Sequence, residues 1–359
     1  GSVVLAERYG PSRMPQILVS DTIRAVKRGE RHAHFNKLLL DRMEETLGGG
    51  GQAMLFQNRR GFAPYVECRE CGWTARCPDC NVTLTLHKGS GRMVCHYCGH
   101  TEPVPAKCPH CRVTEPVPMG FGTEKVEEEI ARVFPEARVA RLDRDSVTSE
   151  RAFRQIVEAF ARGDDDILVG TQMITKGFDF GGVELVGVLN ADNLLNNPDF
   201  RSAERAFQLL MQVAGRAGRH GDQGRVVIQT RLPEDPLFGA LEKQDYRGFA
   251  ESLVEERKEN WCVPFVHQAL VTAQAKTLAE ALYFLNACAK SGFSMAPEDV
   301  RVFDPVPMPL VRLMDVERAQ LLVEADGRAS LNRFLWQWQA TFNAPSGIDW
   351  TIEVDPASI

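Results

Sequence analysis

Four closely spaced CxxC pairs constrain the fold of this chain more than any other feature. Eight of its ten cysteines form the pairs Cys68/Cys71, Cys77/Cys80, Cys95/Cys98 and Cys108/Cys111. A two-residue gap lets both sulfurs of a pair bind one metal ion, and closed four-sulfur sites are structural zinc sites. A disulfide array is disfavoured, because the chain has no secretory h-region and is too long to need such staples. The cysteines therefore predict a module that holds two zinc ions.

The spacing favours one of two ways to share the metals. Residues 81–94, NVTLTLHKGSGRMV, predict two short strands around a KGSG turn. That hairpin would bring the two inner pairs, Cys77/Cys80 and Cys95/Cys98, onto one zinc ion. The outer pairs, Cys68/Cys71 and Cys108/Cys111, would then bind the other. Sequential pairing of neighbouring pairs remains the alternative.

Composition indicates a cytoplasmic protein without a membrane segment. The 359 residues are 44% hydrophobic and 25% charged, which suits two domains and a small insert, and no apolar run reaches membrane length. The formal net charge is −6. Such a charge gives no support to nucleic-acid binding, so any binding has to come from local basic patches.

The chain on either side of the cysteines alternates strands and helices, which predicts a parallel sheet. Expected strands include residues 53–56, 138–143 and 166–171, with a helix over 149–163 between the last two. Thr123 is expected to be the N-cap of a further helix. The pattern predicts an α/β domain formed by residues 1–65 and 114–232, interrupted by a cysteine-rich insert over 66–113.

From residue 233 to 359 the pattern changes to βαββαβ, which predicts a small α+β sandwich with helices on one face of an antiparallel sheet. Near its end, Trp336 and Trp338 are two residues apart on an expected helix. They cannot share one helix face, so at least one of them is expected to be exposed.

Two motifs indicate phosphate chemistry. The segment VGTQMITKGFDF covers residues 169–180, and QVAGRAGRHGDQG covers residues 212–224. In the second segment, Arg216 and Arg219 are three residues apart on one helical turn. They could present two guanidinium groups to a polyphosphate, and Gly215 and Gly218 would allow a close approach.

These motifs resemble the second RecA-like lobe of a superfamily 2 helicase. QVAGRAGR is similar to motif VI, GTQMITKGFDF to motif V and LFQNRRG to motif IV. The eight cysteines between motifs IV and V narrow the resemblance to the PriA family of primosomal replication-restart helicases. The blocks NRRGFAPYVECRECGW, CHYCG, GFGTEKVEEEI and NPDFRSAERAFQLLMQVAGRAGR also resemble that family, and the resemblance covers essentially the whole chain.

The resemblance implies roles for individual residues. Arg216 and Arg219 would be arginine fingers that stabilise charge on the γ-phosphate, with Gln212 beside them. Gly177 and Asp179 would face the nucleotide ribose or brace one of the arginine fingers. The candidates for DNA contacts are Thr171, Arg59, Arg60, Lys88 and Arg92. The implied partners are forked or single-stranded DNA, the single-stranded DNA-binding protein and other primosome proteins.

One departure from the family bears on activity. The chain contains no GxxxxGK[ST] phosphate loop and no DEAH-like acidic motif. We therefore expect a C-terminal fragment of an ATP-dependent 3′→5′ DNA helicase that remodels stalled forks and reloads the replication machinery. ATP and Mg²⁺ would be cofactors of the full-length parent, and this fragment alone, expected to be a monomer, would be inactive. The alternative is a non-catalytic zinc-containing adaptor that binds DNA or protein.

Overall fold

The computed structural model describes residues 14–57, 65–68, 70–71, 73–80, 82–87, 91–95, 98–119, 122–143, 146–147, 149–175, 180–195, 199–218 and 223–358. The chain divides into two compact units. One contains Gly1–Ala63 and Phe121–Leu253, and the other contains Pro64–Gly120 and Val254–Ile359. The two units are described separately below.

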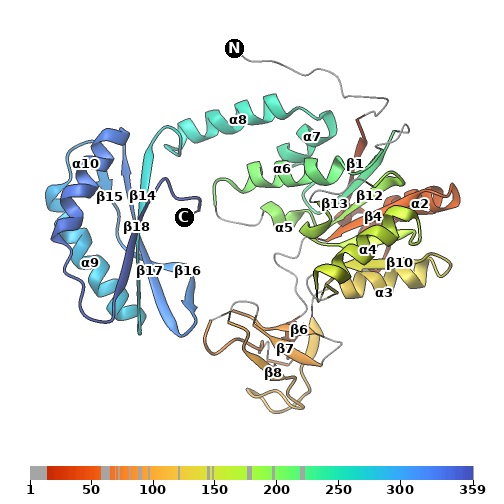
Figure 1. The fold of residues 1–359 in the computed structure, drawn as a ribbon, viewed down its shortest axis with the longest axis horizontal. Coiled ribbons are helices and arrows are strands. Elements are labelled where there is room, and N and C mark those ends of the chain that lie inside the picture. Colours follow the sequence, from red (N-terminus) through yellow and green to blue (C-terminus); the bar gives the residue numbers. More distant parts are fainter. Residues whose placement is uncertain are drawn as a thin grey trace. The chain divides into compact units, whose positions relative to one another are not determined.

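The first unit is built on a six-stranded sheet in which every strand pair is parallel (Figure 1). The strand order is β1-β13-β12-β4-β11-β10. Their bounds are β1 Gln16–Asp21, β13 Arg225–Thr230, β12 Val183–Leu189, β4 Gln52–Gln57, β11 Ile167–Gly170 and β10 Val139–Leu142.

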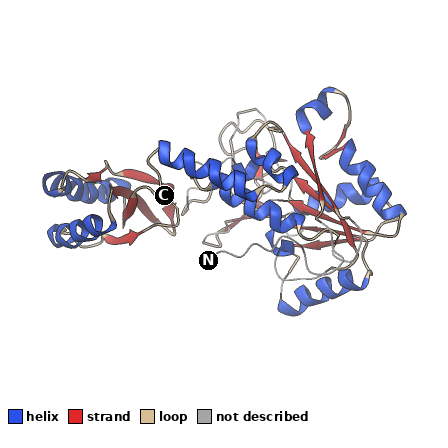
Figure 2. Ribbon diagram, turned by 90° about the horizontal axis from the view of Figure 1, so that it is seen from above, coloured by secondary structure: helices blue, strands red, loops and turns tan. Residues whose placement is uncertain are grey.

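Helices cover both faces of this sheet (Figure 2). Helices α2 (Lys37–Gly48) and α3 (Thr123–Val133) pack on one face, and α4 (Glu150–Arg162), α6 (Ser202–Ala214) and α7 (Pro236–Lys243) pack on the other. Strand β4 shows why its sequence is a continuous apolar run. Ala53 and Leu55 belong to one core and Met54 and Phe56 to the other, so every position is buried.

The remaining elements of this unit are short or lie at its ends. They are α1 Thr22–Lys27, β2 Arg31–His32, β3 Phe35–Asn36, the 3₁₀ turn Gln172–Thr175 and α5 Asp192–Leu195. Helix α8, Tyr246–Glu259, begins in this unit and ends in the other, because the boundary falls after Leu253. One expectation was wrong by a residue, because Gly122 is the N-cap of α3 and Thr123 is its first helical residue. The Thr123 hydroxyl bonds to the Asp143 carboxylate beyond β10 instead of accepting from the helix backbone.

In the second unit, the cysteine module consists of short antiparallel strands. β5 (Tyr65–Glu67) pairs with β9 (Val117–Met119). β6 (Thr85–His87), β7 (Arg92–Val94) and β8 (Thr101–Pro103) form a three-stranded sheet. Strands β6 and β7 pair antiparallel, with Thr85 opposite Val94. The hairpin expected between the inner cysteine pairs is therefore confirmed.

The C-terminal part is an antiparallel sheet with two helices on one face (Figure 1). Its elements are β14 His267–Ala275, α9 Leu278–Met295, β15 Val300–Val302, β16 Val306–Leu313, β17 Val316–Ala325, α10 Arg328–Trp338, the 3₁₀ turn Gln339–Thr341 and β18 Asp349–Val354. The strand order is β15-β17-β14-β18, and β16 also pairs with β17.

The structure has one more strand than the expected βαββαβ order, because one edge of the sheet is interrupted. β15 pairs with the Val323–Ala325 end of β17, whereas β16 pairs with its Val316–Gln320 end. Pro305 lies between them, and proline cannot donate a ladder hydrogen bond. When β15 and β16 are counted as a single interrupted edge strand, the order is βαββαβ, as expected. The predicted fold class, a parallel-sheet lobe with a cysteine-rich insert and an α+β domain, is confirmed.

Candidate functional site

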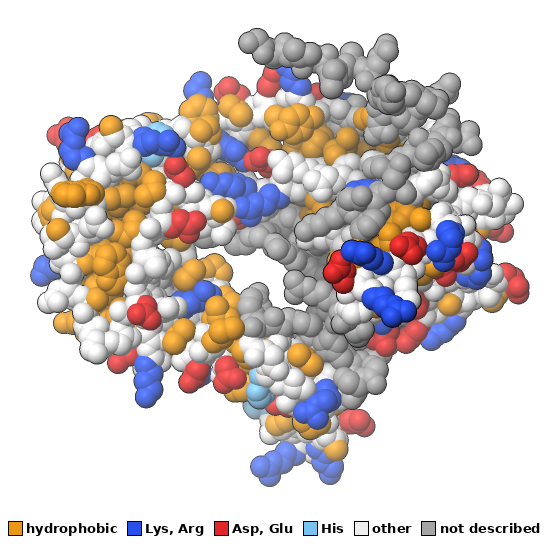
Figure 3. Space-filling model, in the orientation of Figure 1, with side chains coloured by type: hydrophobic (Ala, Val, Ile, Leu, Met, Phe, Trp, Pro, Cys, Tyr) orange, Lys and Arg blue, Asp and Glu red, His pale blue; other side chains and the backbone are white. Residues whose placement is uncertain are grey.

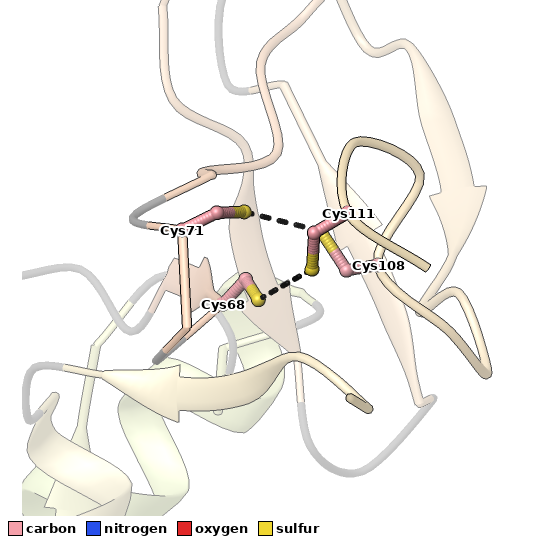
Figure 4. Close-up of side chains that lie close together, drawn as sticks. All are labelled: Cys68, Cys71, Cys108 and Cys111. Atoms are coloured by element: carbon pink, nitrogen blue, oxygen red, sulfur yellow. Dashed lines mark hydrogen bonds between the residues drawn. The ribbon is translucent and has the colours of Figure 1, made fainter. Parts of the chain in front are cut away.

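The outer cysteine pairs lie close together, and Cys68 directly follows β5 (Figure 4). The Sγ atoms of Cys68 and Cys111 are 3.6 Å apart, and so are those of Cys71 and Cys108. Tight turns present these sulfurs, because the Cys68 N–H donates to Trp73 O at 2.8 Å and the Cys108 N–H donates to Thr114 O at 2.9 Å. Thus cysteines 37 to 43 residues apart in sequence face one another across a small space.

The inner pairs form a second cluster of the same design. Cys77, Cys80, Cys95 and Cys98 offer sulfurs that all lie within 4.8 Å of one another, with Cys77 and Cys98 3.6 Å apart. The Cys95 N–H donates to His100 O at 2.8 Å, and the turn between them needs Gly99, whose φ is +79°. The structure groups the cysteines in the nested arrangement and not in the sequential one.

Both clusters fit a tetrahedral zinc ion. Four sulfurs at about 2.3 Å from a metal lie about 3.8 Å from one another, close to the spacing seen here. All eight cysteines are free thiols and not disulfides. The candidate ligands of both clusters are all cysteines, with no histidine among the described residues that could hold an ion there. A closed four-sulfur site leaves no open position for substrate, which makes both sites structural.

The thiols differ in how readily they ionise. Burial raises the pKa of Cys77 to about 12, whereas the Thr114 hydroxyl, which lies 3.4 Å from the Cys68 sulfur, lowers the pKa of Cys68 to about 6. A metal binds the thiolate, so loading the clusters releases protons. Thr114 was missed in the sequence because it lies outside the CxxC pattern.

Helix α6 ends at Ala214, so Arg216, one of the two arginines expected to face phosphate, lies in the turn that follows and not on the helix. Arg216 is 9% exposed, whereas Gln212 is exposed on α6, and Arg219 lies outside the described residues. The Gly218 N–H donates to Val183 O at 2.9 Å, which ties this turn to the first residue of β12. A Cβ on Gly224 would lie 2.5 Å from the Gly218 nitrogen, so only glycine permits this close approach.

Thr171 lies at the opposite end of the strands from this turn. It follows β11, so it is at the carboxyl end of the parallel strands, whereas Val183 and the turn beside it are at the amino end. Thr171 is 6% exposed. The structure therefore does not bring Thr171 and Arg216 together. Gly177 and Asp179, in the segment that connects the two ends, lie outside the described residues.

Of the other candidates for DNA contacts, only Arg92 lies among the described residues. It is exposed on β7, and its Nη2 donates to Thr101 O at 3.3 Å. Arg59, Arg60 and Lys88 lie outside the described residues. On the face shown in Figure 3, lysine and arginine side chains are interspersed with aspartate and glutamate.

Three family models match different parts of the chain. The PriA DNA helicase Cys-rich region domain matches residues 77–103, the helicase conserved C-terminal domain residues 121–221, and the primosomal protein N C-terminal domain residues 258–357. The chain belongs to the PriA family. The first matched segment contains the inner cysteine cluster, the second runs from α3 to the turn after α6, and the third contains the antiparallel sheet domain.

Individual relatives agree with the family match. Replication restart protein PriA of Bacillus subtilis is 40% identical over 92% of this chain and 41% of the relative, and that of Haemophilus influenzae is 37% identical over 99% and 48%. The chain thus spans less than half the length of these relatives. The solved structure of RecG bound to a three-way DNA junction is 15% identical, covering 70% of this chain and 23% of that chain. The TM-score of that match is 0.37.

A membrane-spanning helix would need a long apolar segment. Among the described residues, none of the helices has the length and hydropathy to cross a bilayer.

Proposed function

We propose that this chain is the second-lobe and C-terminal part of an ATP-dependent 3′→5′ DNA helicase of superfamily 2. The parent recognises and remodels stalled or branched replication forks and promotes reloading of the replication machinery in the cytoplasm. The observation that carries the proposal is the combination, in one PriA-family chain, of a helicase lobe with two nested four-cysteine clusters. A non-catalytic adaptor would not need the buried Arg216 in the turn after α6.

In this proposal, Arg216 and Arg219 stabilise charge on the γ-phosphate, Gln212 lies beside them, and Gly177 and Asp179 face the nucleotide. Burial of Arg216 supports its role, because a charge shielded from water acts more strongly on a phosphate than an exposed one. The phosphate itself, with Mg²⁺, has to be held elsewhere, since the 359 residues contain no GxxxxGK[ST] loop. The chain alone therefore hydrolyses no ATP above background.

The test compares this chain with a protein extended by the preceding lobe. DNA-stimulated ATP hydrolysis is measured for both, and 3′→5′ unwinding of forked DNA for the longer one. In the longer protein, Arg216→Ala or Arg219→Ala lowers turnover about 10³-fold or more and leaves DNA affinity largely intact. Arg154→Ala is the control, because Arg154 is exposed on α4 and pairs only with Glu150 among the contacts described. DNA-stimulated ATPase from the present chain alone would refute the proposal.

For the metals, we propose that Cys68, Cys71, Cys108 and Cys111 hold one zinc ion and Cys77, Cys80, Cys95 and Cys98 the other. The sulfur spacing supports both sites. Metal analysis of the purified chain should return two zinc ions per chain. A clearly smaller content, or intact disulfides by mass spectrometry, would contradict this assignment.

DNA binding by this chain is proposed to be weak and sensitive to salt. The candidates are Arg59, Arg60, Lys88, Arg92 and Thr171, and Arg92 is the exposed cation among those described. Each phosphate contact adds about −0.7 to the log–log salt slope on single strands, so a few contacts predict a slope of roughly −2 to −3. Titration with forked DNA at two salt concentrations measures that slope. No binding at low salt would remove DNA contacts from this part of the molecule.

The C-terminal domain is proposed to bind partner proteins, among them the single-stranded DNA-binding protein and other primosome proteins. Trp336 is 77% exposed on α10, and Arg333 is exposed one helical turn before it. An exposed aromatic next to a cation suits a short acidic, apolar peptide. Loss of peptide binding in Trp336→Ala, with Trp336→Phe as the conservative control, tests this role. The chain itself is proposed to be a monomer.

A further inference from the structure

The hairpin of β16 and β17 ends in a turn with two positive φ angles. Leu313 pairs with Val316, so Met314 and Asp315 are the two turn residues, with φ values of +50° and +65°. Two positive φ values identify a type I′ turn, which joins antiparallel strands tightly. In such a turn the strand ladder does not use the N–H groups of the two central residues. The tip of this hairpin therefore presents two adjacent backbone donors.

Both donors are used by the inner cysteine cluster, which belongs to the same unit. The Met314 N–H donates to the Cys80 sulfur at 3.4 Å, and the Asp315 N–H donates to Asp79 O at 3.1 Å. Asp79 and Cys80 are consecutive residues of one CxxC turn. The tip of the C-terminal hairpin thus meets the backbone and the sulfur of a single candidate zinc-binding turn.

Side chains of the hairpin support this contact, but the Met314 side chain takes little part in it. Leu313 packs against the apolar core of the cysteine module, whereas the Met314 side chain is 62% exposed. Arg312 forms an ion pair with Asp315 at 2.5 Å across the turn, which holds the tip in shape. Cys80 itself is fully buried. Backbone donors, and not the Met314 side chain, therefore make the contact with the cluster.

We propose that the β16–β17 turn is a docking element for the inner zinc site, so that metal at this site fastens the C-terminal domain to the cysteine module. A metal-bound thiolate is a stronger acceptor than a neutral thiol, and the metal fixes the turn that carries Asp79 and Cys80. The outer site has no such partner among the described C-terminal residues. This inference rests on the zinc assignment proposed above, but not on helicase activity.

The experiment measures backbone amide hydrogen exchange in the zinc-loaded full chain, at the amides of Met314 and Asp315. Two variants form a matched pair, because Cys98 and Cys111 are both half-buried final cysteines of their clusters. Cys98→Ser should speed exchange at both amides at least tenfold, whereas Cys111→Ser should leave it near the wild-type rate. Equal exchange in the wild type and in Cys98→Ser would overturn the proposal.

A second pair of variants changes the hairpin and leaves all eight cysteines in place. Leu313→Glu should speed zinc release to the chelator 4-(2-pyridylazo)resorcinol several-fold for one of the two ions. Replacement of Met314-Asp315 by Asn-Gly keeps a type I′ turn and both N–H groups, so it should keep the wild-type rate. Unchanged release in Leu313→Glu would overturn the proposal. Metal content is measured first, because absence of the inner zinc would refute the zinc assignment separately.

Discussion

The core of the C-terminal domain should depend strongly on Trp338 and hardly at all on its neighbour Trp336. Trp338 is fully buried, whereas Trp336 is 77% exposed on the opposite side of α10. The Trp338 ring stacks on Phe334 with centroids 5.2 Å apart and meets Phe342 edge-on at 4.7 Å. Its Nε1–H donates to Cys288 O at 2.9 Å, which ties α10 to α9.

The cost of Trp338→Ala can be worked out from these contacts. Truncating a buried aromatic side chain costs about 3–5 kcal/mol through lost burial and the cavity that remains. Loss of the indole hydrogen bond adds little, because the Ser291 hydroxyl also donates to Cys288 O and keeps that oxygen paired. We therefore expect about 4 kcal/mol for Trp338→Ala and less than about 0.5 kcal/mol for Trp336→Ala.

Hydrogen exchange can measure both values locally, which avoids assuming that the whole chain unfolds in one step. Amides of β14, His267–Ala275, report on the sheet that Trp338 covers. A loss of about 4 kcal/mol speeds their exchange by roughly 10³-fold, since about 1.4 kcal/mol corresponds to tenfold. Equal effects of the two substitutions, or less than about 1 kcal/mol for Trp338→Ala, would refute this account of the core.

Three further predictions concern the metals, the α6 turn and pH. Cys77→Ser and Cys98→Ser should each remove one and the same zinc ion and leave the other, measured by metal analysis, and loss of different ions would contradict the nested arrangement. Gly224→Ala should cost about 1–3 kcal/mol in thermal unfolding, because its Cβ would lie 2.4 Å from the Ala217 carbonyl carbon. The control, Gly239→Ala in α7, has nothing within 4 Å and should be neutral or slightly stabilising. Asp166 accepts hydrogen bonds from Arg138, which lower its pKa, so this carboxylate stabilises the fold above its unfolded pKa near 4 and loses that effect as pH falls. The difference between wild type and Asp166→Asn, about 1 kcal/mol or less for this partly exposed pair, should shrink below about pH 4, and a difference independent of pH would contradict it.

Much of the parallel sheet could be predicted from the sequence, because its strands are buried on both faces. The apolar run at β4 and the helical periodicity of α4 each have one low-energy solution, and the structure agrees with both within one or two residues. The sequence before β4 has no apolar run or helical periodicity of comparable clarity. β1, α1 and α2 form there, but the run TIRAVK of α1 is short and half polar, so its structure depends on tertiary packing.

Contacts between distant residues account for most of what the sequence could not predict. The CxxC spacing indicated nested pairs but left sequential pairing open, because spacing alone does not fix which turns meet in space. The tie between Gly218 and Val183 and the bond from Met314 to Cys80 have no local pattern at all. The DNA-contact residues and the three-domain division at 66, 114 and 233 stay predictions, and most of the former lie outside the described residues.

The small apolar core of the cysteine module explains why the two four-cysteine clusters are important for the stability of the unit. Among the described residues of the module, the buried apolar ones other than cysteines are Val66, Ala75, Leu84, Leu86 and Met93. A core of this size cannot offset the conformational entropy of a module of this length, whereas a structural zinc ion contributes roughly 10 kcal/mol or more. In the zinc assignment proposed above, metal is thus the main stabiliser of the module. A C-terminal hairpin that ends on a zinc-binding turn then rests on the part of the unit most dependent on metal, so chelation should be detected at Met314 as well as at the cysteines.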